Sequence, residues 1–311
     1  MVALITVILP VFLLIGAGYI ASRFAGFPQS GIDGLMKFTQ SYAFPCLLFR
    51  AVATIDLGAE FHLPLLGSYY AAAFICYLLG FSAARFIFRR DIEDSIVIGF
   101  CCLFSNTLML GLPITERAFG EDALAANFAI IAIHAPFCYT LGIASMEAAR
   151  GRGTGLNFFG ILAKIARQMG RNPLVIALFL GFVVNLGHIL VPVPVMAGIN
   201  MMVAASIPAA LFAVGGVLTQ YKIEGDLRVV LVICVITLLV HPALVWVFGT
   251  GAGLDRDQFR SALITAAVAP GINTYVFASI YDRAKRVAAS SVLMTTALSL
   301  VTVWMWLTLL P

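Results

Sequence analysis

Long apolar stretches separated by short polar segments run along the whole chain. A scan with a window of about 20 residues, the length that an α-helix needs to cross a bilayer, predicts ten membrane spans, at residues 2–22, 36–54, 64–88, 95–120, 124–146, 173–190, 196–219, 228–249, 258–281 and 287–310. Backbone amides in lipid must be satisfied within the protein, and unbroken apolar runs of this length are typical of helices. We therefore expect an all-α integral membrane protein.

Composition agrees with this prediction and excludes most soluble classes. Apolar residues make up 61% of the chain and charged residues 11%, with a mean hydropathy of +1.01, far from the values of a water-soluble domain. The 6 cysteines all fall inside apolar runs without metal-ligand spacing, so we expect neither a metal nor another cofactor. The first apolar run is too long for a signal peptide, and we expect it to be retained.

The basic residues predict the orientation in the membrane. Alternate loops are rich in Lys and Arg, and fifteen of the 19 basic residues fall in one set of loops: Arg23, Lys37, Arg85, Arg89, Arg90, Arg150, Arg152, Lys164, Arg167, Arg171, Lys222, Arg228, Arg283, Lys285 and Arg286. The other set holds Arg117, Arg256 and Arg260, and Arg50 lies near a helix end. This distribution predicts a multi-pass protein of the cell's inner membrane with both termini non-cytoplasmic. The net charge of +4 indicates that the basic loops lie at the cytoplasmic leaflet, and it predicts no nucleic-acid partner.

The two halves of the chain are similar. Pro10 and Pro173, and likewise Pro45 and Pro208, lie 163 positions apart, which favours an internal repeat. We predict a first repeat at residues 1–148, a cytoplasmic linker with an amphipathic helix at 149–172, and a second repeat at 173–311. Since each half has an odd number of spans, the repeats are inverted, an arrangement that recurs in secondary transporters and places the site at the repeat interface.

The fourth and ninth spans are both interrupted by Gly and Pro beside an Asn-Thr pair. Alone, each interruption is more simply a kink, but two at matching places favour a binding site, because the exposed N-termini of half-helices attract a carboxylate. The predicted substrate-binding residues are Asn106, Thr107, Gly111, Pro113, Pro270, Gly271, Asn273, Thr274 and Tyr275, with Pro45 and Pro208 of the second and seventh spans. We expect Asn106 and Asn273, with backbone amides near Gly111 and Gly271, to contact the anion.

Ionisable residues refine this prediction. Every Asp and Glu falls in a loop or at a span end, which argues against cation antiport and leaves a cavity that does not repel an anion. His134 and His241 lie inside the fifth and eighth spans, either as neutral rings bonded to a carbonyl or as proton-coupling groups. Arg50 either extends to the interface or attracts the anion.

Four motifs together resemble the auxin efflux carrier family, which includes plant auxin exporters and bacterial malonate or malate carriers. They are Ser105-Asn106-Thr107 with Gly111-Leu112-Pro113, Pro270-Gly271-Ile272-Asn273, Arg171-Asn172-Pro173, and Pro45-Cys46-Leu47-Leu48-Phe49. The resemblance implies ten helices in two inverted five-helix repeats, related to bile acid symporters, whose fourth and ninth helices are broken and cross at the substrate. It also implies a scaffold of the first, second, sixth and seventh helices and a transport domain formed by the rest. The short linker is similar to that of the bacterial members and favours a small carboxylate over auxin.

The resulting hypothesis is a secondary transporter, not an enzyme, that carries a small organic anion and contacts membrane lipids. A sodium-coupled bile-acid-type symporter and a channel or receptor of the same fold are the alternatives. An intramembrane enzyme would need a nucleophile with its base, paired acids or metal ligands at membrane depth, which the residues do not offer. We expect an efflux or uniport carrier of the elevator type. The direction of transport, the anion, coupling to protons and a homodimeric state stay open.

Overall fold

The structure is a computed structural model that describes residues 4–54, 62–120, 123–151, 167 and 170–310. Within these residues the regular elements are all helical, and the one β-type contact is an isolated bridge. Six helical segments are long and apolar enough to cross a membrane: residues 5–24, 63–87, 124–150, 193–218, 227–251 and 285–309. The other four predicted spans coincide with shorter helices. The predicted amphipathic helix of the linker lies almost entirely outside the described residues.

The chain divides into two compact units, each built from both halves of the sequence. Unit 1 consists of residues 1–8, 62–166 and 221–311, and unit 2 of residues 9–61 and 167–220.

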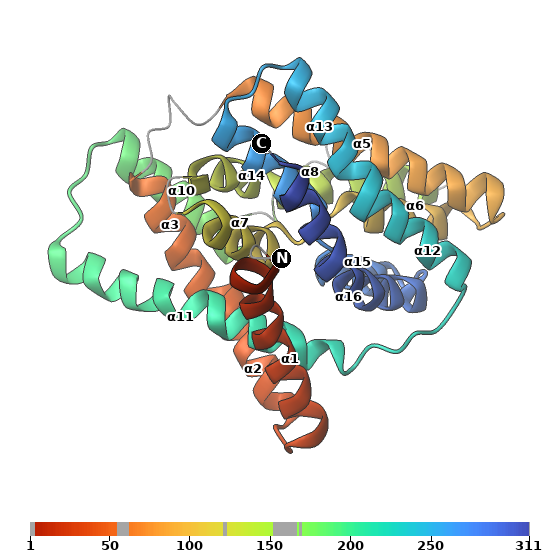
Figure 1. Cartoon of the computed structure of the whole chain (residues 1–311), viewed down its shortest axis with the longest axis horizontal. Coiled ribbons are helices and arrows are strands. Elements are labelled where there is room, and N and C mark those ends of the chain that lie inside the picture. The colour runs from red at the N-terminus through yellow and green to blue at the C-terminus, as the bar shows by residue number, and fades with distance from the viewer. Residues whose placement is uncertain (1–3, 55–61, 121–122, 152–166, 168–169, 311) are drawn as a thin grey trace. The chain divides into compact units, whose positions relative to one another are not determined.

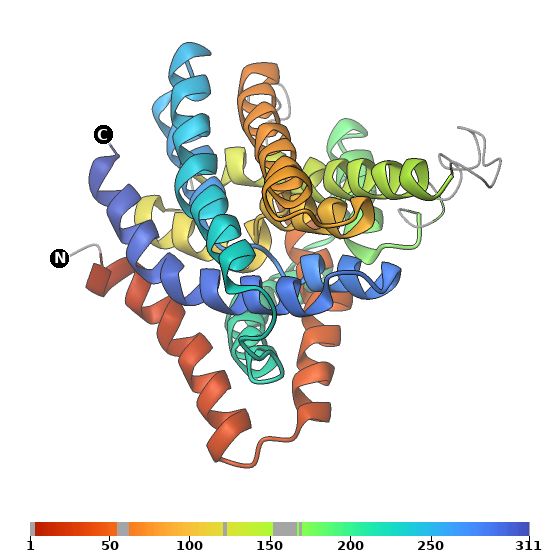
Figure 2. The ribbon, with the colours of Figure 1, turned by 90° about the vertical axis from the view of Figure 1, so that its right-hand side faces the viewer.

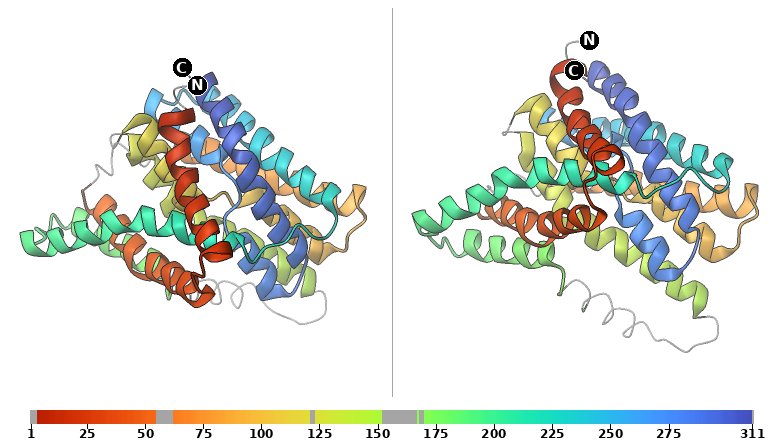
Figure 3. Two further views of the ribbon diagram at one scale, coloured as in Figure 1. Left: turned by 60° about the horizontal axis from the view of Figure 1, so that its bottom comes forward. Right: turned by 90° about the horizontal axis from the view of Figure 1, so that it is seen from below.

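In its described residues, unit 2 contains five α-helices, α1 (Leu9–Phe24), α2 (Gln29–Phe38), α3 (Phe44–Thr54), α10 (Pro173–Leu186) and α11 (Val193–Leu218). α1 packs across α11 (Figure 3), and glycines let the two backbones touch. A Cβ at Gly18 would lie 1.9 Å from the carbonyl oxygen of Phe212, and one at Gly215 would lie 1.8 Å from that of Ile15. Small residues at a helix contact are a general means of bringing membrane helices close together.

Unit 1 contains the remaining helices, shown in Figure 1 and, turned by 90°, in Figure 2. They are α5 (Leu63–Ser82), α6 (Ile92–Leu103), α7 (Leu112–Phe119), α8 (Leu124–Arg150), α12 (Leu227–Val235), α13 (His241–Gly251), α14 (Arg256–Ala267), α15 (Asn273–Tyr281) and α16 (Lys285–Leu309). α5 packs on α6 and α13, and α14 contacts α8, α13 and α16. α16 is one uninterrupted helix that runs past α15 (Figure 2).

Five π-helical turns occur among the described residues, at Leu4–Ile8, Thr39–Ala43, Ala83–Ile87, Thr107–Gly111 and Ile236–Val240. Four of them are followed two residues later by a proline: Pro10, Pro45, Pro113 and Pro242. A proline inside a helix has no N–H to donate, and its ring clashes with the carbonyl of the preceding turn. The widened turn relieves that clash, so the prolines explain where these helices change their winding.

Candidate functional site

Two interrupted helices meet inside unit 1, and the segments between their halves pair with each other. The first helix stops at Leu103 and resumes at Thr107, and the second stops at Ala267 and resumes at Asn273. The amide of Asn106 donates to the carbonyl of Ala269 at 2.9 Å, and the amide of Gly271 donates to the carbonyl of Phe104 at 3.1 Å. We call this paired region, residues 104–106 and 269–271, the crossing.

The pairing explains how a helix break is tolerated at this place. The two hydrogen bonds flank an antiparallel bridge between Ser105 and Pro270. In such a bridge the central pair exchanges no hydrogen bond, so the missing N–H of Pro270 costs nothing there. Each interruption satisfies backbone groups that the other leaves free, which lipid could not do.

Side chains at and just after the crossing form hydrogen bonds at the N-termini of the two resumed helices. The Oδ1 atom of Asn106 accepts a hydrogen bond from the amide of Met109 at 3.3 Å, so Asn106 is the N-cap of the helix that begins at Thr107. Its Nδ2 group remains available as a donor. On the other helix, the hydroxyl of Thr274 donates to the carbonyl of Gly271 at 2.8 Å. Asn106 is 8% exposed and Thr274 is fully buried.

Two of the predicted amide donors are already engaged. The amide of Gly271 belongs to the bridge, and that of Gly111 donates to the carbonyl of Asn106 at 3.0 Å. Among the described residues, the amides of Leu108, Ile272 and Asn273 form no hydrogen bond. These three groups lie in the first turns of the two resumed helices, where amides are left free and carry partial positive charge.

A histidine lies on each side of Ser105. The carbonyl oxygen of Ser105 is 3.1 Å from Nε2 of His134, and its hydroxyl is 3.4 Å from Nδ1 of His241. Both imidazole rings are buried, and the ring of Tyr69 lies 6.0 Å from that of His134 and 5.3 Å from that of His241. A carbonyl oxygen can only accept, so Nε2 of His134 carries a hydrogen. His134 therefore makes the bond to a carbonyl that is expected of a neutral buried histidine.

A second polar cluster lies beside Gly111, where α7, α8 and α14 meet. The Nδ2 group of Asn127 donates to the hydroxyl of Thr265 at 2.6 Å and to that of Thr115 at 3.4 Å. All three side chains are fully buried, and a Cβ at Gly111 would lie 3.5 Å from Cα of Thr265. The Oδ1 atom of Asn127 has no hydrogen-bond partner among the described residues.

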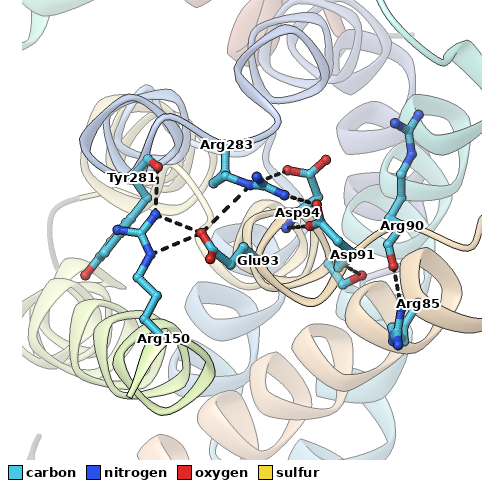
Figure 4. A network of polar contacts seen from close by, with 9 residues as sticks. Arg85, Arg90, Asp91, Glu93, Asp94, Arg150, Tyr281 and Arg283 are labelled. Atoms are coloured by element: carbon cyan, nitrogen blue, oxygen red, sulfur yellow. Dashed lines mark hydrogen bonds and ion pairs between the residues drawn. The ribbon is translucent and has the colours of Figure 1, made fainter. Parts of the chain in front are cut away.

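One group of charged residues of unit 1 lies at the helix ends shown in Figure 4, away from the crossing. Asp91 caps α6, and Glu93 accepts two bonds from Arg150, at 2.8 and 3.1 Å. Arg283 pairs with Asp91 and, at 2.9 Å, with Asp94. Acids at the N-terminus of α6 and a base at the C-terminus of α8 also match the helix dipoles.

Glu147 is 8% exposed, but it lies in the last turn of α8, so its position agrees with the prediction that acids occur at span ends. Asp282 lies in the loop before α16, where the ammonium of Lys285, the first residue of that helix, lies beside it and lowers the pKa of its carboxyl.

The predicted site residues fall in both units. The predicted residues of the fourth and ninth spans lie in unit 1, at the crossing or within the first turns that follow it, with the ring of Tyr275 5.0 Å from that of Tyr221. Pro45 and Pro208 lie in unit 2, in α3 and α11, which pack against each other. In that unit the guanidinium of Arg50 donates to Asn200 at 3.3 Å.

Tyr69, Asn127 and Thr265 were not predicted from the sequence, and Ser105 was predicted only as part of a motif, without a role. Each of these residues is polar and lies inside a predicted span, which indicates a functional or structural contact because a buried polar group in lipid needs a partner. Which partners meet could not be read from the sequence, because Asn127 and Thr265 come from different halves of the chain.

Comparison with known proteins decides the family. A family model described as "Membrane transport protein", the auxin efflux carrier family, matches residues 3–307, nearly the whole chain. The chain belongs to this family. It is 26% identical to a Rhizobium meliloti protein named "Putative malonate transporter", over 95% of this chain and 92% of that protein. It is 22% identical to an uncharacterized transporter of Methanocaldococcus jannaschii, over 96% of each chain. An uncharacterized transporter of Escherichia coli is 20% identical over 96% of this chain and 95% of its own length. The chain is thus a multi-pass membrane transporter, and its family indicates transport rather than catalysis.

Proposed function

We propose that this protein is a secondary transporter that carries a small organic anion, a mono- or dicarboxylate or an auxin-like acid, across the cell's inner membrane. The main observation in support of this proposal is the geometry of the crossing. Two resumed helices begin there with free amides, and Asn106 and Asn273 can add donors without a fixed charge. Neutral donors hold a carboxylate and still release it.

The charges around the crossing support an anion as the substrate. The stretches 103–112 and 264–276 contain no Asp or Glu. In α6, α7 and α14, each Asp and Glu lies in the half of the helix that is farther from the crossing. An anion held at the crossing would meet helix N-termini and amides rather than carboxylates. The relative named as a malonate transporter agrees with a small carboxylate.

We further propose ten membrane helices in two inverted five-helix repeats with both termini non-cytoplasmic. Unit 2 would be the scaffold and unit 1 the transport domain of an elevator-type carrier. The composition of the units supports this, because each combines helices from both halves of the chain and both interrupted helices belong to unit 1. The loop basic residues support the orientation.

Purified protein provides the first test. A thermal-shift screen against malonate, succinate, propionate and indole-3-acetate should raise the melting temperature for at least one anion, because a ligand that binds only the folded state stabilises it. The anion that binds should then show saturable uptake and counterflow in proteoliposomes.

The same assay separates the alternatives. Uptake that needs sodium, lost when choline replaces it, would assign a bile-acid-type symporter. Flux without saturation or counterflow would assign a channel. If no carboxylate stabilises the protein or is transported, the proposed function is wrong.

A further inference from the structure

The crossing has a buried histidine pair whose role the proposed anion site does not explain. Ser105 belongs to the bridge between the two interrupted helices, and both of its oxygens face an imidazole nitrogen. The residue next to it, Asn106, is the first proposed contact with the anion. A change in the protonation of either ring would therefore act on the crossing through one residue.

The two histidines differ in what their nitrogens do. Nε2 of His134 is a donor to a carbonyl, and its ring also lies 3.9 Å from the sulfur of Cys138. Nδ1 of His241 faces the hydroxyl of Ser105, and its Nε2 makes no hydrogen bond of normal geometry among the described residues, although the backbone of Ala266 lies near the ring. A hydroxyl donates or accepts, so Ser105 can serve His241 in either protonation state. His241 is thus the ring whose partner can adapt to a change of protonation.

Among the described residues, the helices around His241 place no carboxylate beside a protonated ring. The ring of Tyr69, from α5, lies next to His241 and also next to His134 of α8, which in turn contacts Tyr70 and Cys138. α14, which packs on the helix of His241, has Arg256, Asp257 and Arg260 in its first half. The π-helical turn before it has no charged residue, and α16 has only Lys285 and Arg286, in its first turn. The charged residues of α6, α7 and α14 lie in the halves of those helices that are farther from the crossing. A proton on His241 would leave a buried positive charge unpaired, which is unfavourable.

A bound carboxylate would provide the missing charge. Resting on the proposed function, we propose that His241 takes up one proton together with the anion, so that the carrier moves the two as a neutral pair. The proton comes from water to the ring nitrogen that carries no hydrogen in the neutral histidine when the anion binds at the crossing, and it returns to water when the anion leaves.

Thermodynamic linkage between proton binding and anion binding provides a measurement that tests the proposal. If one proton binds with each anion, affinity for the anion rises by up to tenfold for each unit of falling pH, and the anion in turn favours proton uptake. The probe is propionate or indole-3-acetate, whichever binds more tightly, because its single carboxyl is ionised above about pH 6. Binding is titrated calorimetrically between about pH 6 and pH 8, in pairs of buffers with different ionisation enthalpies.

The wild-type protein should bind the probe more tightly at lower pH and take up close to one proton per anion. His241→Gln, which keeps a hydrogen-bonding side chain but cannot be charged, should still bind at pH 8 and lose both effects. His62→Gln, at an exposed histidine before α5, should behave like the wild type.

Comparing the wild-type protein in the paired buffers tests whether a proton is taken up with the anion, even if His241→Gln does not fold. Affinity independent of pH with no proton uptake would overturn the coupling and leave the proposed function intact. The coupling would also be wrong if His241→Gln folded and kept the full pH dependence. Absence of binding by either probe and by the dicarboxylates at every pH would overturn both proposals.

Discussion

At the scale of single residues, Asn127 joins three helices of unit 1 through two hydroxyl groups. Its replacement by Ala leaves Thr115 and Thr265 without their donor in a fully buried place. Removing the hydrogen bonds of a buried group costs roughly 1–3 kcal/mol, so Asn127→Ala should melt several degrees below the wild type. Thr308→Ala, at an exposed hydroxyl that bonds to its own helix, is the matched control and should melt unchanged. Equal melting temperatures for the two variants would mean that this cluster contributes nothing.

The residues of the two interruptions could be predicted because Gly and Pro act on their own backbone. Pro270 removes a backbone donor and Gly271 loosens the backbone wherever they occur, and the Asn-Thr pairs mark polar positions inside apolar runs. The contacts of Ser105 with His134 and His241 could not be predicted, since they join segments that are separate in the chain. The engagement of the Gly271 amide depends on the antiparallel pairing, and that of the Gly111 amide on the π-helical turn, neither of which a helical pattern indicates.

At the scale of elements, the contact between α1 and α11 depends on glycine. A Cβ at Gly215 would lie 1.8 Å from a backbone oxygen of α1, whereas one at Gly198 of the same helix would meet nothing within 4 Å. Gly215→Ala should therefore push the helices apart and lower the melting temperature or the folded yield. Gly198→Ala should stabilise by about 0.4–1 kcal/mol, because alanine restricts the unfolded chain. The packing account is wrong if both substitutions change the melting temperature in the same direction by similar amounts.

Hydropathy predicted most helices well, because a lipid-exposed helix is apolar along its whole length. It did not predict the π-helical turns, although a proline follows four of the five. The second predicted span shows the reason: α2 and α3 are joined through the turn Thr39–Ala43, and a window average cannot register one extra residue per turn. The six long segments that the structure shows are fewer than the ten predicted spans. Two of the spans that are not among the six are the interrupted helices, and a third is α10, which has 14 residues.

At the scale of the whole molecule, the orientation of unit 1 makes a prediction about its two ends. The side chain of Arg286 is 80% exposed at the start of α16, and Arg256 is exposed at the start of α14. Single cysteines in place of each should differ toward an impermeant thiol reagent on intact cells, with Arg256→Cys labelled and Arg286→Cys labelled only after the membrane is opened. The native cysteines of unit 1 are buried and should give little background. The reverse pattern would place the termini in the cytoplasm.

The proposed transport by relative motion of two units could be anticipated only through the family resemblance. Nothing in the hydropathy pattern tells which helices pack together, because every apolar span looks alike to such a scan. The division into units depends on contacts between helices from opposite halves, such as α1 with α11 and α3 with α10. The inverted repeat and the linker helix at 149–172 stay predictions.

The central claim, that an organic anion binds at the crossing, is tested most directly by Asn106→Asp. An aspartate caps a helix as well as asparagine does, so this variant keeps the acceptor for the amide of Met109 and should melt like the wild type. It also places a like charge beside the anion. The control is Asn172→Asp, which changes the N-cap of α10 in unit 2 in the same way.

The measurement is the affinity of each purified variant for the carboxylate that binds the wild type most tightly. Loss of one hydrogen bond to a charged partner costs about 1.5–3 kcal/mol, roughly tenfold to a hundredfold in affinity, and Asn106→Asp should lose at least that much. Asn172→Asp should bind normally. If a well-folded Asn106→Asp protein binds the anion as tightly as the wild type does, the crossing is a structural feature and the anion binds elsewhere.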